Sequence, residues 1–156
     1  MAPETTRVRT TAERVADTRV RLGRDVDAWV ASASAQGGVP CLVPLSFLWV
    51  DEAFLLATLA DGPTDRNLSD GGTARLALDG TRDVVLVDGE AETLPLAAVP
   101  DPVAEAFAAH TGFDPRAEPE AYAWILVRPR WVRAWRDVPE LQGRVVMRDG
   151  VWLTAD

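Results

Sequence analysis

Hydrophobic and polar residues alternate along most of this chain with the short period of β-strands, and helical spacing is confined to a few segments. Runs rich in Val, Leu, Phe and Trp are bounded by Gly, Pro, Asp or Asn, as in strands joined by tight turns. The predicted strands cover residues 28–33, 39–50, 53–58, 73–79, 83–94 and 122–136, followed by a hairpin over 145–154. Because strands and helices do not alternate regularly, the pattern predicts a mainly β protein with a few helices, an antiparallel barrel of six to seven strands.

The N-terminal part of the chain has the spacing of a short helix. Thr10 and Glu13 stand in the positions of a capping box, in which each side chain bonds the backbone N–H of the other residue. Gly23 fits the end of this helix, because glycine readily adopts the left-handed conformation that terminates helices. We therefore divide the chain into an N-terminal tail and short helix over 1–23, of which the first nine residues are loose, and a barrel domain over 24–156.

Two more helices are predicted between strands. A short one begins near Arg66, soon after the third strand. The other spans residues 99–111, with Asp101 as its N-cap and Pro102 in its first helical position, where a missing N–H does no harm.

Two prolines interrupt the strand predicted over 39–50. Pro40 and Pro44 each lack the N–H that a residue of a central strand donates to its neighbour. We therefore expect part of this strand to have a free edge or a bulge that faces something other than another strand.

Charge and composition exclude several classes of function. The net charge is −8, so long-range attraction to nucleic acid or to an anionic membrane has the wrong sign. All 16 basic residues are arginine, which excludes a lysine-linked Schiff base and a P-loop lysine. The single cysteine, Cys41, lies in an apolar run and predicts a buried thiol. We see no secretory signal and no apolar run long enough to cross a bilayer, and expect a cytoplasmic protein.

Common catalytic and metal-binding patterns are not found in the sequence. With His110 as the only histidine, neither a structural zinc site nor a Ser-His-Asp triad is supported, and we expect this residue near a helix end. The segment 61–72 has the composition of a calcium loop, but its acids and glycines do not fall at the ligand positions. A Gly-x-Gly-x-x-Gly motif is missing as well. We predict no metal site.

Several segments resemble, by their order and spacing, one family of proteins. These segments are Val39 to Trp49, Ala53 to Thr58, Arg66-Asn67-Leu68, Ala74 to Leu78, Val84 to Glu92 and Ile125 to Trp135. From about Asp25 to Trp152 the chain is similar to the pyridoxamine 5′-phosphate oxidase-like split β-barrels that bind FMN, in particular to the branch that uses flavin or the deazaflavin coenzyme F420. The resemblance implies a homodimer with the cofactor at the subunit boundary.

The resemblance also implies a set of cofactor-binding residues. They are Val43, Pro44, Leu45, Ser46, Thr58, Thr64, Arg66, Asn67, Arg133 and Trp135. The backbone of the first four would face the isoalloxazine ring, and Thr58 would end the next strand. The run around Arg66 would bind the phosphate, which agrees with an arginine and an amide beside the free N–H groups of a helix start. Arg133 and Trp135 would flank the ring, often from the partner subunit.

One position departs from the family pattern. Thr64 stands where the family usually has a lysine, two residues before the arginine. The change removes a charge-assisted hydrogen bond of roughly 1.5–3 kcal/mol, which would weaken anion affinity by about one to two orders of magnitude. Asp65 makes the segment still less cationic.

The resemblance implies an FMN-dependent oxidoreductase that transfers a hydride to or from a small organic substrate. A deazaflavin-dependent reductase is one alternative, and a non-catalytic protein that stores, senses or shields a cofactor is another. A barrel that has lost its cofactor and serves as a dimeric interaction module is the third. The expected partners are a second copy of the chain and a small redox substrate, with no nucleic acid and no membrane.

Overall fold

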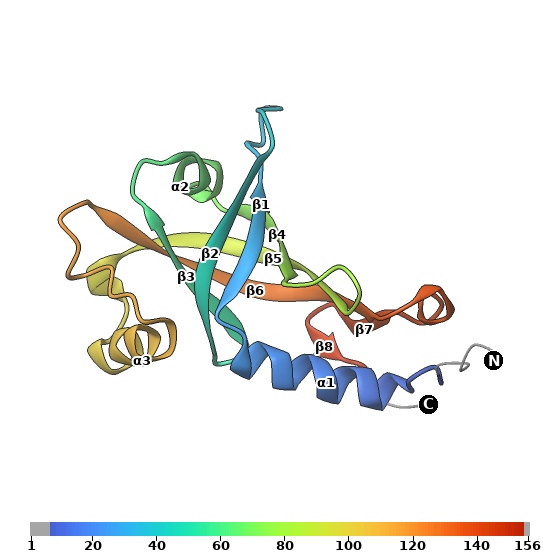
Figure 1. Cartoon of the computed structure of the whole chain (residues 1–156). Coiled ribbons are helices and arrows are strands. Elements are labelled where there is room, and N and C mark those ends of the chain that lie inside the picture. The colour runs from blue at the N-terminus through green and yellow to red at the C-terminus, as the bar shows by residue number, and fades with distance from the viewer. Residues whose placement is uncertain (1–6, 155–156) are drawn as a thin grey trace.

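The computed structural model describes residues 7–154 of the chain, which form one barrel with helices around it (Figure 1). The strands are β1 Asp27–Ser32, β2 Cys41–Val50, β3 Ala53–Leu59, β4 Gly72–Leu78, β5 Val84–Pro95, β6 Tyr122–Trp135, β7 Val145–Arg148 and β8 Val151–Trp152. The α-helices are α1 Thr11–Arg24, α2 Pro63–Leu68 and α3 Asp101–Thr111, and short 3-10 turns cover Leu96–Ala98 and Val138–Glu140. Every strand predicted from the sequence is present, close to its expected bounds.

Six strands close into an antiparallel barrel. Hydrogen bonds join them in the order β3-β2-β1-β4-β5-β6, and β6 pairs back onto β3. Closure pairs strands that would otherwise be the edges of an open sheet. The short strands β7 and β8 extend the sheet beyond β6 as a hairpin, and its turn residues Asp149 and Gly150 both have positive φ. The predicted antiparallel barrel of six to seven strands is confirmed.

Inward-pointing side chains from alternate strand positions fill the barrel. Val30, Phe47, Phe54 and Leu76 are all fully buried, and the rings of Phe47 and Phe54 pack at 5.0 Å between centroids. Helix α1 crosses the lower end of the barrel and adds Leu22 to the same core (Figure 1). The alternating apolar residues of the sequence therefore mark the inner face of the barrel.

Helix α1 begins where the sequence predicts. The Thr10 hydroxyl accepts a hydrogen bond from the Glu13 N–H, and the Glu13 carboxylate accepts one from the Thr10 N–H at 2.8 Å. The helix runs one residue past Gly23. Arg9, which the sequence placed in a loose tail, is only 7% exposed and is held by Glu140, whereas residues 1–6 of that tail lie outside the described residues.

Helix α3 covers the outer side of β3 and the first part of β6. Phe107 of the helix packs edge-on against Trp124 at 4.9 Å, so β3 is buried on both faces. The predicted cap of this helix is wrong by one residue, because Pro100 is the N-cap and Asp101 is already helical. The error is small, because Pro102 takes the second helical position, whose N–H also has no acceptor within the helix, and proline is therefore tolerated there as well.

No helix among residues 7–154 is long and apolar enough to span a membrane.

Candidate functional site

The barrel is split between β2 and β3 along the first half of β2. Strand β2 pairs with β1 over its length up to Ser46, but its pairing with β3 begins only at Phe47. The Phe47 N–H points toward β1 and donates to the Val26 carbonyl at 2.7 Å. Because the backbone groups of successive residues point to opposite sides of an antiparallel strand, those of Pro44 and Ser46 point away from β1. Pro44 therefore has no N–H on the side of β2 where no neighbouring strand would accept a hydrogen bond. The free edge predicted from the prolines is present.

The residues predicted on β2 divide between the two sides of the strand. Val43 and Leu45 face Val30 and Ala28 in the barrel interior, whereas Pro44 is exposed on the outer face. Ser46 also points outward, and its hydroxyl donates to the Asp27 carboxylate at 2.7 Å. Their backbone, not their side chains, lines the split.

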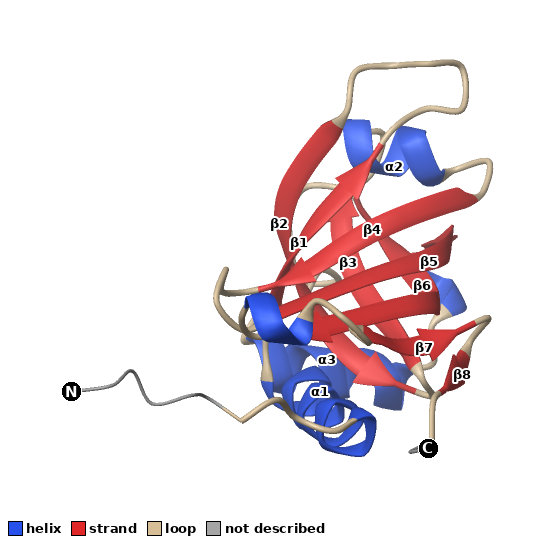
Figure 2. Ribbon diagram, turned by 90° about the vertical axis from the view of Figure 1, so that its right-hand side faces the viewer, coloured by secondary structure: helices blue, strands red, loops and turns tan. Residues whose placement is uncertain are grey.

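Helix α2 lies at the upper end of the split, beside the end of β3 (Figure 2). Thr58, near the end of β3, is 8% exposed. Thr64 is 3% exposed, and its hydroxyl lies 3.7 Å from the Cys41 thiol of β2. The half-buried Asn67 amide donates to the Ser32 hydroxyl of β1 at 3.2 Å. The Thr64 and Asn67 side chains fasten α2 to the barrel end.

Arg66 differs from its neighbours on α2. Its side chain is exposed and makes no hydrogen bond or ion pair with any residue in the range 7–154. The first helical residue is Pro63, which has no N–H, and the Asp65 carboxylate accepts the Asp61 N–H at 2.8 Å. The cation available at this end of the barrel is therefore the Arg66 guanidinium.

The outer faces of β2, β1, β4, β5 and β6 form one continuous surface, which no α-helix covers over β1, β4 and β5 (Figure 2). Strand register places one row of side chains straight across it. The row is Pro44, Trp29, Ala77, Leu86 and Arg133. Trp29 is 46% exposed, and Leu42 in the adjacent row is 62% exposed. This uncovered face carries an apolar patch.

Arg133 and Trp135 lie at the far end of that face. Arg133 donates to Asp88 at 3.1 Å, and Arg75 of β4 bonds the other oxygen of the same carboxylate. Burial alone would raise the pKa of Asp88, but the hydrogen bonds and charges of Arg75 and Arg133 outweigh it and hold that pKa below its ordinary value. Trp135 lies under the Arg144 guanidinium, 5.9 Å from the ring centroid.

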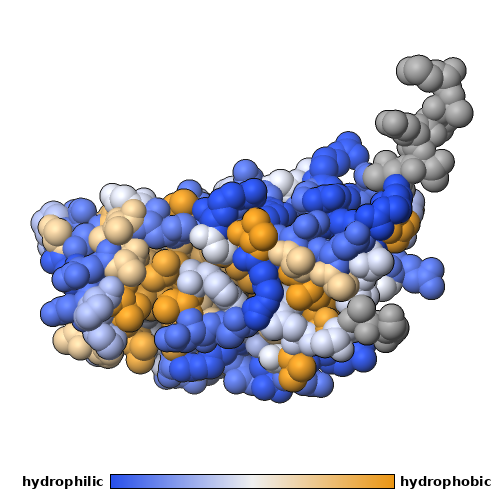
Figure 3. All heavy atoms as spheres, turned by 90° about the horizontal axis from the view of Figure 1, so that it is seen from below, coloured by the Kyte–Doolittle hydropathy of each residue, from blue (hydrophilic) through white to orange (hydrophobic). Residues whose placement is uncertain are grey.

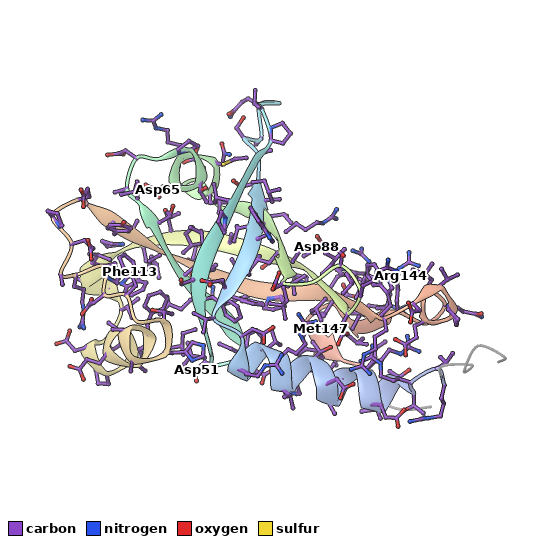
Figure 4. All side chains as sticks on the ribbon, in the orientation of Figure 1. Asp51, Asp65, Asp88, Phe113, Arg144 and Met147 are labelled. Carbon is purple, nitrogen blue, oxygen red and sulfur yellow. The ribbon has the colours of Figure 1, made fainter. Side chains whose placement is uncertain are left out.

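Within one chain, the two groups of predicted residues do not meet. Strands β5, β4 and β1 lie between β6 and β2, a separation of roughly 19 Å along the sheet at about 4.8 Å per strand. Asp65 on α2 and Arg144 beside Trp135 accordingly lie well apart in Figure 4. The structure brings β2, Thr58 and α2 together and leaves Arg133 and Trp135 apart from them.

Comparison by sequence finds no matching protein-family model and no curated protein that matches. Comparison by structure finds a putative pyridoxamine 5′-phosphate oxidase from Listeria innocua, with TM-score 0.62 and 12% identity over 78% of this chain and 98% of that chain. An F420 reductase matches with TM-score 0.59 and 16% identity, over 73% of this chain and 94% of its own. A FAD-binding protein from Mesorhizobium loti matches with TM-score 0.58 and 19% identity, over 75% and 90%.

The fold is the pyridoxamine 5′-phosphate oxidase-like split barrel. At the opening between β2 and β3, a backbone N–H and a guanidinium are the groups that could hold a cofactor. The Ser46 N–H faces the opening, and the Arg66 guanidinium has no acid bound to it among residues 7–154. Among those residues, no group of acids, histidines and cysteines could hold a metal ion.

Asp27, Trp29 and Asp79 line a cavity beside Pro44, and no motif in the sequence marks them as site residues. One signal could have pointed to them. In the alternating pattern of β1, Trp29 occupies an outward position between two inward ones, where a polar residue is expected.

Proposed function

We propose that this protein is a flavin- or deazaflavin-dependent oxidoreductase that binds its cofactor at the opening between β2 and β3. The proposal rests on two features that occur together at this opening. The upper half of β2 presents a free backbone edge, and the exposed Arg66 guanidinium lies unpaired at the same end of the barrel.

Each part of the opening has a task in this proposal. Arg66 neutralises the cofactor phosphate, with the Asn67 side chain held beside it by Ser32. The backbone of Val43 to Ser46 lies along the ring, and the outward Ser46 N–H bonds a polar ring atom. Thr58 and Thr64 are both buried and do not contact the phosphate, and Thr64 fixes the position of α2 against Cys41.

The cofactor, when bound, supplies the hydride chemistry, and the chain supplies position, electrostatics and exclusion of water. The described residues near the opening include no histidine, and we assign no general acid. FMN is the first candidate, and the deazaflavin coenzyme the second.

The proposal includes a homodimer. The upper part of the uncovered face places Leu42 in solvent, and exposed apolar surface of this kind is found at protein interfaces. A second copy packed on this upper part can bring its Arg133 and Trp135 to the opening, which a single chain leaves without them. We propose that the partner subunit contributes these residues to the site.

A non-catalytic cofactor carrier is the second candidate, and one observation favours it. Thr64 replaces the lysine of the resembling family and points into the barrel, so a single guanidinium faces the phosphate beside Asp61 and Asp65. Such a site holds a cofactor less tightly. A carrier would bind flavin but show no turnover with any reductant.

The test is calorimetric titration of the purified protein with FMN and with coenzyme F420, for wild type and for Arg66→Gln. Arg82→Gln is the matched control, because Arg82 is exposed and has no described partner but lies in the β4–β5 turn. Micromolar binding of one cofactor, weakened roughly tenfold or more in Arg66→Gln and unchanged in Arg82→Gln, supports the site. No binding of either cofactor would contradict the proposal.

A further inference from the structure

A cavity of about 490 Å³ opens at the lower end of the uncovered face, between the end of α1 and the start of β1. Its walls include Trp29 and Pro44, which are neighbours in the row that crosses the face. Ser46, the next outward residue of β2, bonds Asp27 of the same cavity. The cavity therefore adjoins the strand that the proposed function places along the isoalloxazine ring.

The two arginines of the cavity are already engaged. Asp25 accepts hydrogen bonds from Arg21 at 3.2 Å and from Arg24 at 2.8 Å. The remaining Arg21 nitrogens donate to the backbone carbonyls of Asp79 and Asp83, both at 2.6 Å. Arg21 thereby holds the end of α1 against the β4–β5 turn, and the two cations face two carboxylates, Asp25 and, 3.9 Å from Arg21, Asp83.

Two carboxylates of the cavity are not balanced. The pairing of β1 with β4 ends at Ala28 and Leu78, and Asp27, which precedes Ala28, and Asp79, which follows Leu78, both line the cavity at that end. Neither carboxylate forms an ion pair with a residue in the range 7–154. Like charges on adjacent strands repel and destabilise a sheet when they lie close together. A cation bound between them would remove that repulsion.

The indole of Trp29 completes the arrangement. It is 46% exposed, lies two residues from Asp27 on the same face of β1, and forms one wall of the cavity. An exposed indole beside unpaired carboxylates attracts organic cations, because the face of the ring is negative and the ring also offers an apolar surface.

We propose that this cavity selects a substrate with a cationic nitrogen, an amine, guanidinium or pyridinium, carried on a ring or short apolar chain. The nitrogen lies between Asp27 and Asp79, and the apolar part lies on Trp29 and Pro44. The role of this cation as the redox substrate rests on the proposed function. The binding of such a cation in the cavity does not depend on that function. Anionic substrates such as phosphate esters are disfavoured here.

Three probes of one shape test the charge preference: benzylammonium, benzyl alcohol and benzoate. Binding is followed in the indole N–H region of a ¹⁵N spectrum, with the Trp29 signal assigned through Trp29→Phe. Benzylammonium is expected to shift the Trp29 signal with saturation, benzyl alcohol more weakly, and benzoate not at all. Higher ionic strength should weaken the ammonium binding, because the carboxylates are exposed.

Asp27→Asn and Asp79→Asn keep the side-chain shape and remove one charge each. Each is expected to weaken benzylammonium binding roughly two- to fivefold, the range for exposed ion pairs. Asp70→Asn, an exposed acid beyond α2, is the control and should change nothing. Equal binding of benzoate and benzylammonium, no effect of either variant, or no saturable shift by about 10 mM would overturn the inference.

Cofactor titration of the same variants separates the two proposals. If FMN or F420 binds normally while benzylammonium shows no charge preference, the cavity inference fails and the proposed function stands. If benzylammonium binds as expected but neither cofactor binds, the cavity is an organic-cation site in a protein of another function.

Discussion

Glu140 is buried against Arg9, 131 residues away in the sequence, and its carboxylate accepts hydrogen bonds from both the backbone N–H and the guanidinium of that arginine. A further bond comes from the Arg136 N–H at 2.9 Å. Arg14 of α1 also donates to the Gly143 carbonyl at 2.6 Å. Together these contacts fasten the N-terminal helix to the segment that follows β6.

Glu140→Gln is expected to destabilise the protein. The hydrogen bond from the Arg9 side chain is the largest cause that lowers the pKa of Glu140, to about 2, against the opposing effect of burial. A shift from 4.5 to about 2 corresponds to roughly 3 kcal/mol of stability at neutral pH. Urea unfolding at pH 7 measures the loss, with the exposed Glu118→Gln as a control that should be nearly neutral.

The same pair predicts how stability depends on acid. Because the folded pKa of Glu140 is depressed, its contribution is complete above the ordinary pKa of 4.5 and is lost as pH falls toward about 2. Wild type should therefore lose more stability than Glu140→Gln between pH 5 and 2.5, read as the change in urea midpoint. Parallel curves for the two proteins would count against a buried charged pair.

Thr64→Lys, which restores the family residue, is not expected to strengthen phosphate binding. Thr64 is 3% exposed and faces Cys41, so an ammonium there would be buried or would push α2 off the barrel. We expect a lower melting temperature and a cofactor affinity no higher than that of wild type. Thermal melts and calorimetry with FMN measure both, and a tighter complex in Thr64→Lys would show that this side chain can reach the phosphate.

Leu42→Glu is expected to separate the proposed dimer into monomers. Leu42 is 62% exposed on the uncovered face, and an unpaired charge buried there on association would weaken the dimer by roughly tenfold or more. Light scattering after size exclusion measures the mass. Val39→Glu is the control, because Val39 is 87% exposed in the β1–β2 loop, before β2 begins. A wild-type monomer at high micromolar concentration would refute the dimer.

Two glycines should respond to alanine with opposite signs. A Cβ at Gly89, beside the bulge between β5 and β6, would fall 2.6 Å from a Val127 methyl and 2.8 Å from the Arg128 carbonyl oxygen. Gly89→Ala should therefore lose about 1–3 kcal/mol. At Gly23 in α1 no atom lies within 4 Å of the added Cβ, so Gly23→Ala should gain about 0.5–1 kcal/mol. Denaturant midpoints of both variants give the comparison.

The strands could be predicted from the sequence because their signals are local. Alternating apolar residues set the inward face, and turn residues such as Asp149-Gly150 set the ends. The split of the barrel was also foreseeable, since Pro44 cannot donate to a neighbouring strand. Helix ends were predicted less closely: α1 runs one residue past Gly23, α2 begins at Pro63 rather than near Arg66, and α3 has Pro100 as its N-cap.

Contacts between distant segments could not be predicted. Nothing near Arg9 in the sequence indicates Glu140, and nothing near Asp27 indicates that Asp79 lines the same cavity. The burial of Thr64 likewise depends on how α2 docks between strands that are far apart in the chain. Side-chain direction on a short helix follows from that docking, not from the helix's own residues.

The missing N–H of Pro44 has a consequence for how the protein behaves in a crowded solution. The upper part of β2 is a strand edge without a neighbour, and such an edge can template pairing with a strand of another chain. Proline interrupts the row of donors that edge-to-edge aggregation needs, and the exposed ring adds a steric block. The opening of the barrel can therefore stay accessible to a small molecule while resisting addition of a foreign strand.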